Sequence, residues 1–172
     1  MANKKLKIGI VGCGGIMRWA HLNAYTKMDN VEIVALCDIV PGKAESVIQY
    51  CRDTFHSDML DNAKCYTDFY EFIQNPEIES VDICTPNYLH APFAIKAFEM
   101  GKHVFSEKPD SVSVEDVTKM KEASEKAGKV LMIMRNNRHE GASKKLKSLI
   151  EAGEMGDIYC GRCGWIRRRG IP

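Results

Sequence analysis

Two short motifs hold the residues of this chain that could do chemistry. Gly12-Cys13-Gly14-Gly15 closes an apolar run near the start, and Glu107-Lys108-Pro109 closes a second one. A glycine-rich turn between a strand and a helix presents backbone amides, and the positive end of the helix, to a pyrophosphate. The second motif places a primary amine at the end of a strand. The two motifs therefore predict a phosphate-binding turn and an acid–base group in one protein.

The glycine motif follows most of the G-x-G-x-x-G pattern that binds dinucleotides. Gly12 permits the tight turn, Gly14 lets the backbone approach the pyrophosphate, and Gly15 frees the start of the helix. The third position of the pattern holds Met17, where glycine or alanine is usual, so the match is imperfect. We expect the cofactor to bind at Gly12, Gly14, Gly15, Ile16 and Met17.

An acidic residue at the end of the second expected strand supports the same interpretation. Asp38 stands there, where a carboxylate accepts hydrogen bonds from the ribose hydroxyls of adenosine and repels a 2′-phosphate. We therefore expect NAD and regard NADP as the weaker candidate, although Lys43 offers a partner for a phosphate. The alternative is that Asp38 only caps the following helix or starts a turn.

Alternating strands and helices would position these groups. Short runs that are apolar on both faces are typical of buried parallel strands, and apolar residues at three- and four-residue spacing are typical of helices. The expected strands cover residues 6–11, 31–37, 64–66, 81–84, 103–106 and 130–134. The expected helices cover residues 16–28, 41–51, 69–74, 88–100, 114–127 and 142–152. We predict an α/β fold with a doubly wound parallel sheet, a Rossmann dinucleotide-binding domain.

Several boundaries carry their own signals. Asp68 and Ser113 stand where helices should begin, and Gly101 and Gly128 stand where helices should end. Residues 52–63 are polar and aperiodic, so we expect a surface loop there. Residues 158–166 resemble a further strand. An isolated strand is not stable, so we expect it to pair in a dimer or in a longer molecule.

Composition gives no support to several classes of partner. The chain has 172 residues, of which 45% are hydrophobic, and its formal net charge is +1. Nothing in this balance favours nucleic acid or an anionic membrane. No apolar run reaches the length of a signal-peptide core or of a membrane-spanning helix. We expect a cytoplasmic protein with no membrane partner.

The cysteines do not indicate a metal site. Their number is 7, several lie in apolar runs, and no secretory feature accompanies them. We read them as reduced thiols. Cys160 and Cys163 have the spacing of metal ligands, but no second pair lies nearby. We expect no bound metal.

Polar residues follow two further strands, at the edge where open α/β sheets bind ligands. They are Thr85-Pro86-Asn87 with His90, and Glu107-Lys108-Pro109. The proline disfavours helical geometry at Lys108 and so fixes the direction of the lysine. A lone Lys-Pro pair is also common in solvated loops. Next to a dinucleotide site, however, this amine suggests a nicotinamide-dependent oxidoreductase.

Together these motifs resemble the Gfo/Idh/MocA family of oxidoreductases. The resemblance extends over essentially the whole chain, and Glu-Lys-Pro and Thr-Pro-Asn-x-x-His are its most specific parts. It rests on residues 12–16, 38, 85–90, 101–104, 107–109, 136, 138 and 165–172. Residues 134, 135, 137 and 139 depart from the family's pattern.

The resemblance implies an NAD(P)-dependent dehydrogenase that acts on a sugar, an inositol or a related polyol. Lys108 would lie beside the nicotinamide and contact the cofactor. It would also be catalytic and relay the proton of the substrate hydroxyl during hydride transfer, while Glu107 would orient the nicotinamide ribose. The peptide between Lys108 and Pro109 is often cis in similar proteins. The further residues expected to contact the cofactor are Thr85, Pro86, Asn87, His90 and Asn136.

The resemblance also implies a second domain that supplies most of the substrate pocket and the oligomer interface. We expect residues 1–140 to form the NAD(P)-binding domain, and residues 141–172 to form a linking helix and an incomplete start of the substrate domain. The chain would then bind cofactor but be catalytically incomplete, and its full-length form would be a homo-oligomer. Two alternatives stay open, an NAD-using glycoside hydrolase of the same fold and a non-catalytic NAD-binding regulatory protein.

Overall fold

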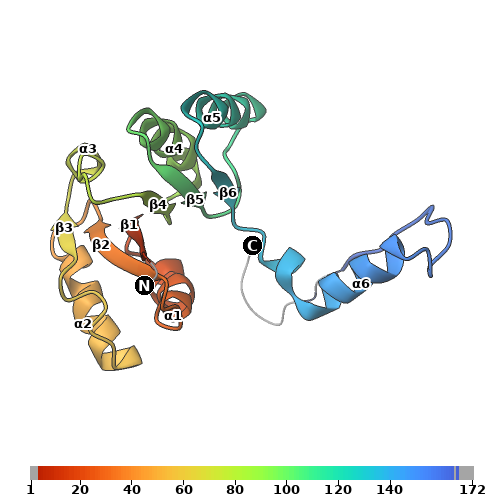
Figure 1. Cartoon of the computed structure of the whole chain (residues 1–172), viewed down its shortest axis with the longest axis horizontal. Helices are drawn as coiled ribbons and strands as arrows, with labels where there is room; N and C mark the ends of the chain where they lie inside the picture. The colour runs from red at the N-terminus through yellow and green to blue at the C-terminus, as the bar shows by residue number, and fades with distance from the viewer. Residues whose placement is uncertain (1–3, 165, 167–172) are drawn as a thin grey trace. The chain divides into compact units, whose positions relative to one another are not determined.

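A computed structural model of the chain describes residues 4–164 and 166 (Figure 1). Its centre is a six-stranded sheet in the order β3-β2-β1-β4-β5-β6, and every neighbouring pair is parallel. The strands are β1 (Leu6–Val11), β2 (Val31–Cys37), β3 (Lys64–Tyr66), β4 (Ser80–Ile83), β5 (His103–Ser106) and β6 (Leu131–Ile133). This order is that of a Rossmann domain, with its switch point between β1 and β4. The predicted fold class is confirmed.

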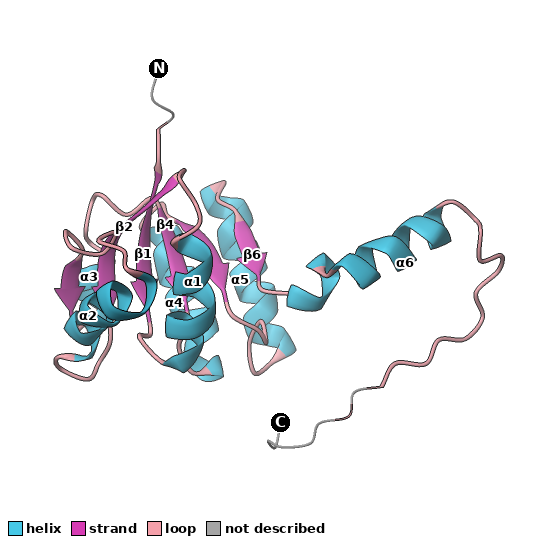
Figure 2. Ribbon diagram, turned by 90° about the horizontal axis from the view of Figure 1, so that it is seen from below, coloured by secondary structure: helices cyan, strands magenta, loops and turns pink. Residues whose placement is uncertain are grey.

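Helices cover both faces of the sheet, as Figures 1 and 2 show. In Figure 1, α1 and α2 lie below the strands, and α3, α4 and α5 lie above them. The helical segments of this part are η1 (Met17–His21), α1 (Leu22–Tyr25), α2 (Lys43–Phe55), α3 (Phe69–Phe72), η2 (Asn87–Leu89), α4 (His90–Glu99) and α5 (Val114–Ala127). Both layers are needed because the strands are buried on both faces.

The core consists of two clusters, one on each face of the sheet. Successive residues of a strand point to opposite faces, so Ile8 and Ile10 of β1 pack toward α1 and α2 while Val11 packs toward α3 and α4. Gly9 lies between them. A Cβ at Gly9 would come within 2.6 Å of Ile78 Cδ1 and 2.7 Å of Phe72 Cζ. Phe72 and Ile78 belong to the same cluster as Val11. That cluster therefore fills the space that a side chain at Gly9 would need.

The predicted helix boundaries are confirmed where capping residues mark them. The side chain of Asp68 accepts a hydrogen bond from the amide of Glu71 over 2.9 Å, and that of Ser113 accepts one from Asp116 over 3.1 Å. Gly128 follows α5 with a φ of 62°, a left-handed conformation that glycine adopts without strain. The residue types at these capping positions thus determine where α3 and α5 begin and where α5 ends.

Two expectations about local structure are wrong. Residues 52–55 belong to α2, which continues to Phe55 because its left-handed end is formed by His56, with a φ of 52°, and no glycine marks the position. An ion pair of 2.8 Å between Arg52 and Asp61 then anchors the loop. Residues 158–164 and 166 form no strand, since no described strand pairs with them.

The described part of the chain divides into two compact units. The first ends at Met134, and the second begins at Arg135 and contains η3 (Asn136–His139) and α6 (Gly141–Glu151). Helix α6 buries none of its residues. Among the described residues, no helix combines the length and the apolar character that crossing a membrane requires.

Replacing Gly9 by alanine should destabilise the protein without touching the glycine loop. The added methyl group meets Phe72 and Ile78, which are 0% and 1% exposed, so we expect a loss of about 1–3 kcal/mol in the free energy of unfolding. Urea unfolding measures this loss. Gly14→Ala is the control, because a Cβ there meets no atom within 4 Å. Equal stability of both variants would contradict the packing around Gly9.

Candidate functional site

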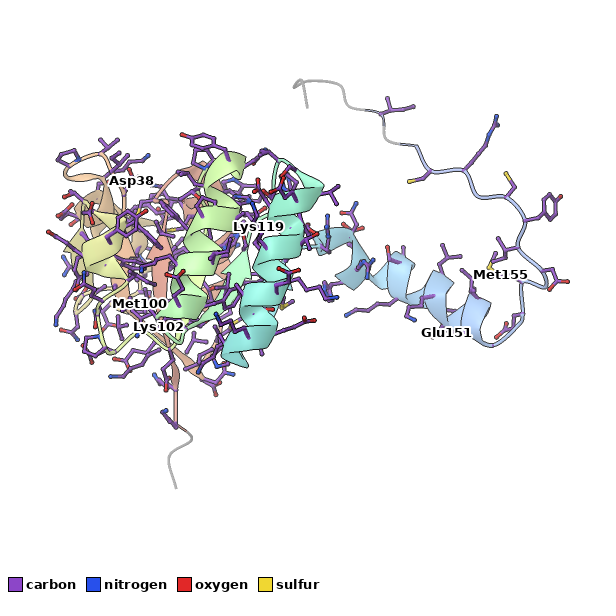
Figure 3. The ribbon with its side chains drawn as sticks, turned by 90° about the horizontal axis from the view of Figure 1, so that it is seen from above. Asp38, Met100, Lys102, Lys119, Glu151 and Met155 are labelled. Carbon is purple, nitrogen blue, oxygen red and sulfur yellow. The ribbon has the colours of Figure 1, made fainter. Side chains whose placement is uncertain are left out.

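The candidate site lies at the carboxyl edge of the sheet. Gly12 follows β1, Asp38 follows β2, Thr85 follows β4 and Glu107 follows β5. Because all these strands are parallel neighbours, their following loops meet at one edge. Figure 3 shows Asp38 at this edge and Lys102, which precedes β5, at the opposite one. The topology therefore brings both motifs to the same side of the domain.

Gly12 holds the glycine loop against the loop after β4. Its φ is 94°, and a Cβ there would lie 2.6 Å from the carbonyl oxygen of Cys84. Both facts require glycine. Gly14 and Gly15 differ from it, since a Cβ at either would meet nothing within 4 Å. Open space thus lies beside the backbone where a pyrophosphate is expected.

Asp38 joins the glycine loop to the end of β2. Its Oδ2 accepts a hydrogen bond of 2.9 Å from the amide of Cys13, and its Oδ1 accepts one of 3.0 Å from Val40. Lys43 Nζ lies 3.1 Å from Oδ2. Burial raises the pKa of Asp38, but the two amides and Lys43 outweigh it and hold this pKa below its ordinary value. Asp38 is therefore ionised at neutral pH, and it also starts the turn that the alternative reading proposed.

A cavity of about 440 Å³ opens beside Asp38. Its lining includes Gly12 and the polar residues Asp38, Lys43, Thr67 and Asp68. Its lining also includes Ile39, Val40, Tyr70, Thr85, Pro86 and Phe93. Ile39 is 85% exposed and Tyr70 is 57% exposed. Apolar walls around a few polar groups are typical of a small-molecule site.

The loops after β4 and β5 are tied together by His90. Its ring is fully buried, and its two nitrogens lie 2.7 Å from the carbonyl oxygen of Pro109 and 2.9 Å from that of Thr85. His90 therefore supports the two loops from inside the protein. Asn87, at the start of η2, is exposed. Its expected contact with the cofactor stays a prediction.

Lys108 is exposed at the edge of the sheet, and its peptide bond with Pro109 is cis, as the resemblance implied. The preceding carboxylate is turned inward. Glu107 is 6% exposed, and its Oε2 accepts a hydrogen bond of 3.0 Å from the backbone amide of Lys108 itself. Glu107 thus holds the backbone that carries the lysine.

A histidine to which the sequence pattern assigns no role lies beneath this loop. Nδ1 of His21 lies 2.8 Å from Asp82 Oδ2, and Nε2 lies 2.9 Å from Glu107 Oε1. Burial lowers the pKa of His21, but the hydrogen bonds and charges of the two carboxylates outweigh it and raise this pKa to about 9. Asp82 is the signal that could have revealed it, because an acidic residue inside an apolar strand needs a partner.

Cys84 adds a thiol to this buried group. Together with His21 and Asp82 it offers three possible metal ligands within 4.8 Å of one another. The thiol of Cys84 already has Asp82 Oδ1 as an acceptor at 3.6 Å, and each nitrogen of His21 already faces a carboxylate. The arrangement fits a hydrogen-bonded network better than a metal site.

Three more residues are expected to contact the cofactor: Ile16, Met17 and Asn136. The side chain of Met17 is fully buried in the core beneath α1, so any contact with a cofactor would come from its backbone. Ile16 is partly buried against the same cluster. Asn136 belongs to the second compact unit, and its role stays a prediction.

The comparison with known proteins decides the family. A model described as an oxidoreductase family with an NAD-binding Rossmann fold, Gfo/Idh/MocA, matches residues 6–135. The chain belongs to the Gfo/Idh/MocA family. The inositol 2-dehydrogenase of Salmonella paratyphi B is 35% identical over 153 residues, which are 88% of this chain and 43% of that protein.

Other members of the family support this assignment. The glucose-6-phosphate 3-dehydrogenase of Bacillus subtilis is 34% identical over 88% of this chain and 40% of its own length. The WlbA dehydrogenase of Bordetella pertussis, solved with NADH and UDP-GlcNAcA, matches with a TM-score of 0.78 and 29% identity, over 92% of this chain and 43% of that one. The chain therefore spans less than half the length of these Gfo/Idh/MocA relatives.

The stability of this Gfo/Idh/MocA domain should fall as the pH rises from neutral. The pKa of His21 is about 9 in the folded protein and about 6.5 in an unfolded chain. The folded state binds the proton more tightly, so the stabilisation is present below the unfolded pKa and is lost as the pH rises through the folded one. Between about pH 7 and about pH 8.5 we expect a loss of about 2 kcal/mol.

Urea unfolding at a series of pH values measures this loss. The control is His21→Gln, whose profile should be flatter over the same range because it lacks the titrating ring. Parallel profiles of the two proteins would contradict the charge assigned to His21.

Proposed function

We propose that the chain binds NAD at the carboxyl edge of its sheet and is the cofactor-binding part of a dehydrogenase for sugars, inositols or related polyols. The observation that carries the proposal is the cavity beside Asp38, at the end of a glycine loop whose backbone faces open space. NAD, when bound, supplies the nicotinamide that exchanges a hydride with the substrate.

The residues present fit a dinucleotide. The glycine loop offers backbone amides to a pyrophosphate, with no Cβ at Gly14 or Gly15 to obstruct it. The ionised Asp38 offers acceptors to ribose hydroxyls and repels a 2′-phosphate, which favours NAD over NADP. The hydroxyl oxygen of Thr85 is buried and has no hydrogen-bond partner among the described residues. A polar atom of this kind is expected to meet a ligand or water.

Lys108 is the group proposed to move the proton. Its side chain is exposed at the same edge, and the hydrogen bond from its amide to Glu107 fixes the backbone from which it extends. The amine takes the proton of a substrate hydroxyl as the hydride leaves, and returns it in the reverse reaction. The rest of the site has only to orient the two reactants.

The substrate class is proposed from the relatives. Inositol 2-dehydrogenase and glucose-6-phosphate 3-dehydrogenase are both named for ring alcohols, and WlbA was solved with a nucleotide sugar. We therefore expect a cyclic polyol or a sugar as the substrate. The homo-oligomer that the family resemblance implies for the whole protein stays a prediction. No observation favours the hydrolase or the regulatory alternative.

Removing the carboxylate of Asp38 should weaken NAD binding and reduce the ratio by which the protein binds NAD more tightly than NADP. We expect Asp38→Ala to raise the dissociation constant for NAD by about tenfold, the effect of losing a hydrogen bond to a charged group. Asp38→Asn keeps an acceptor and should chiefly relax the discrimination against NADP. Calorimetric titration with both cofactors measures this, with Asp53→Ala on α2 as the exposed control. An unchanged preference in both Asp38 variants would remove Asp38 from the proposed site.

Replacing Lys108 by alanine should separate binding from chemistry. NAD binding should change by less than about twofold, whereas kcat for oxidation of myo-inositol or an aldose should fall by about 100-fold or more in a form of the protein that turns over. The matched control is Lys119→Ala on α5. An unaltered kcat would exclude the lysine from the mechanism.

Release of an aryl group from an aryl glycoside would instead favour the hydrolase, and NAD binding without turnover of any polyol would favour the regulatory protein.

The same assay tests whether the 172-residue chain is catalytically incomplete, as we propose. It should bind NAD and show little steady-state turnover.

A further inference from the structure

The buried group around His21 is more elaborate than packing requires. Three segments meet there: the end of η1, the strand β4 and the loop that follows β5. The side chains of His21 and Asp82 are each 1% exposed and that of Glu107 is 7% exposed. Two carboxylates and a histidine so far from water are costly unless each is paired.

A proton on each ring nitrogen of His21 lets both contacts with the carboxylates be hydrogen bonds. A neutral imidazole has a single N–H, so it could donate to only one of two carboxylates. The distances to Asp82 and Glu107 are both hydrogen-bond distances, 2.8 and 2.9 Å. With both carboxylates ionised, only the imidazolium satisfies both contacts.

Two other titratable side chains, Tyr25 and Cys84, contact this group. Tyr25, on α1, donates its hydroxyl to Asp82 over 2.9 Å, and burial raises its pKa. Cys84 lies 3.5 Å from His21 Nδ1 and stays a thiol because burial raises its pKa. The remaining ring contact is with Phe105, which does not titrate. His21 is thus the cation of this group.

Glu107 connects this cation to the loop that carries the lysine. Its Oε1 faces His21 and its Oε2 accepts the amide of Lys108. One planar carboxylate that is held at both oxygens has little freedom to rotate. If the contact with His21 is lost, Glu107 is free to turn, and the amide of Lys108 loses its acceptor.

The segment that carries His21 begins at the glycine loop. The amide of Arg18 donates to the carbonyl of Gly14 over 3.2 Å, and the π-helical turn Met17–His21 follows directly. Such turns are rare in proteins overall, and those that occur often lie at functional sites. A single helical segment therefore joins the expected pyrophosphate site to the loop of Lys108.

We propose that His21 is a positioning residue for Lys108: its imidazolium holds Glu107 in the one orientation that caps the backbone amide of Lys108. That this serves proton transfer rests on the function proposed above for Lys108. The hydrogen-bonded arrangement itself does not depend on that function, so the two can fail separately.

Nuclear magnetic resonance of the whole chain, labelled with ¹⁵N and ¹³C, tests the proposal. Both ring nitrogens of His21 should be protonated at neutral pH. Carbon-detected spectra, which do not depend on amide protons, report the chemical shift of the backbone nitrogen of Lys108. This shift should change with pH at the same midpoint as the titration of the His21 ring. A singly protonated His21 at neutral pH, or a Lys108 signal that ignores its titration, would overturn the proposal. This measurement on the unaltered protein needs no variant to fold.

Hydrogen exchange of the variants separates positioning from a general structural role. In His21→Gln the amide of Lys108 should lose protection by about tenfold more than the amide of Glu107, which donates to Ile83 over 2.9 Å. His103→Gln, on the same sheet, is the matched control and should leave Lys108 unchanged. Uniform loss of protection across the sheet would show that His21 only stabilises the fold.

Two further measurements separate the positioning role of His21 from the proposed NAD-binding function. The affinity of His21→Gln for NAD should stay within about threefold of the parent value, because the glycine loop is intact. Should the parent chain not bind NAD, the proposed function fails, whereas the His21 titration is still interpretable. Zinc that displaces the ring protons of His21 would show a metal site and overturn the assignment of His21 as a cation.

Discussion

The close approach of Gly12 to the backbone of Cys84 is the contact on which the rest of the site depends. Strands β1 and β4 pair directly at the switch point of the sheet, and a Cβ at Gly12 would lie 2.6 Å from the Cys84 carbonyl oxygen. Without glycine the loop after β1 would have to move away from the loop after β4. The bond from the Cys13 amide to Asp38 then holds the same loop from the side of β2.

Buried charge at this edge fixes positions more than it adds stability. Asp38, Asp82 and Glu107 each have a hydrogen-bonded donor, and His21 supplies the cation between two of them. The desolvation of such groups can offset the attraction between them. What they provide is geometry, because a buried carboxylate with satisfied oxygens has few alternative arrangements. The loops after β1, β2 and β5 are held in this way.

The fold could be predicted from the sequence wherever the signal is local. Short strands that are apolar on both faces, and capping residues such as Asp68 and Gly128, mark elements whose neighbours in the chain determine them. The end of α2 could not be predicted, because His56 takes a left-handed conformation that its residue type does not announce. Nor could the absence of a strand over residues 158–164 and 166, since a strand exists only if another strand pairs with it.

In the site, likewise, the sequence predicts the positions of the loops but not the directions of their side chains. Parallel topology predicts which loops meet, so the positions of Gly12, Asp38, Thr85 and Lys108 follow from strand order. Which way a side chain turns depends on packing from distant segments. His90 and Glu107 face inward, and His21 is joined to Glu107 from a part of the chain that no local pattern connects to it.

The groups open to a ligand are few: the backbone at Gly14 and Gly15, the cavity beside Asp38, and the exposed Lys108. The groups behind them are buried and hydrogen-bonded, and two of them hold the backbone amides of Cys13 and Lys108. A site that is rigid before it binds loses less entropy on binding and needs less rearrangement during the reaction. The inward-facing residues therefore contribute to function by restraining the residues that face outward.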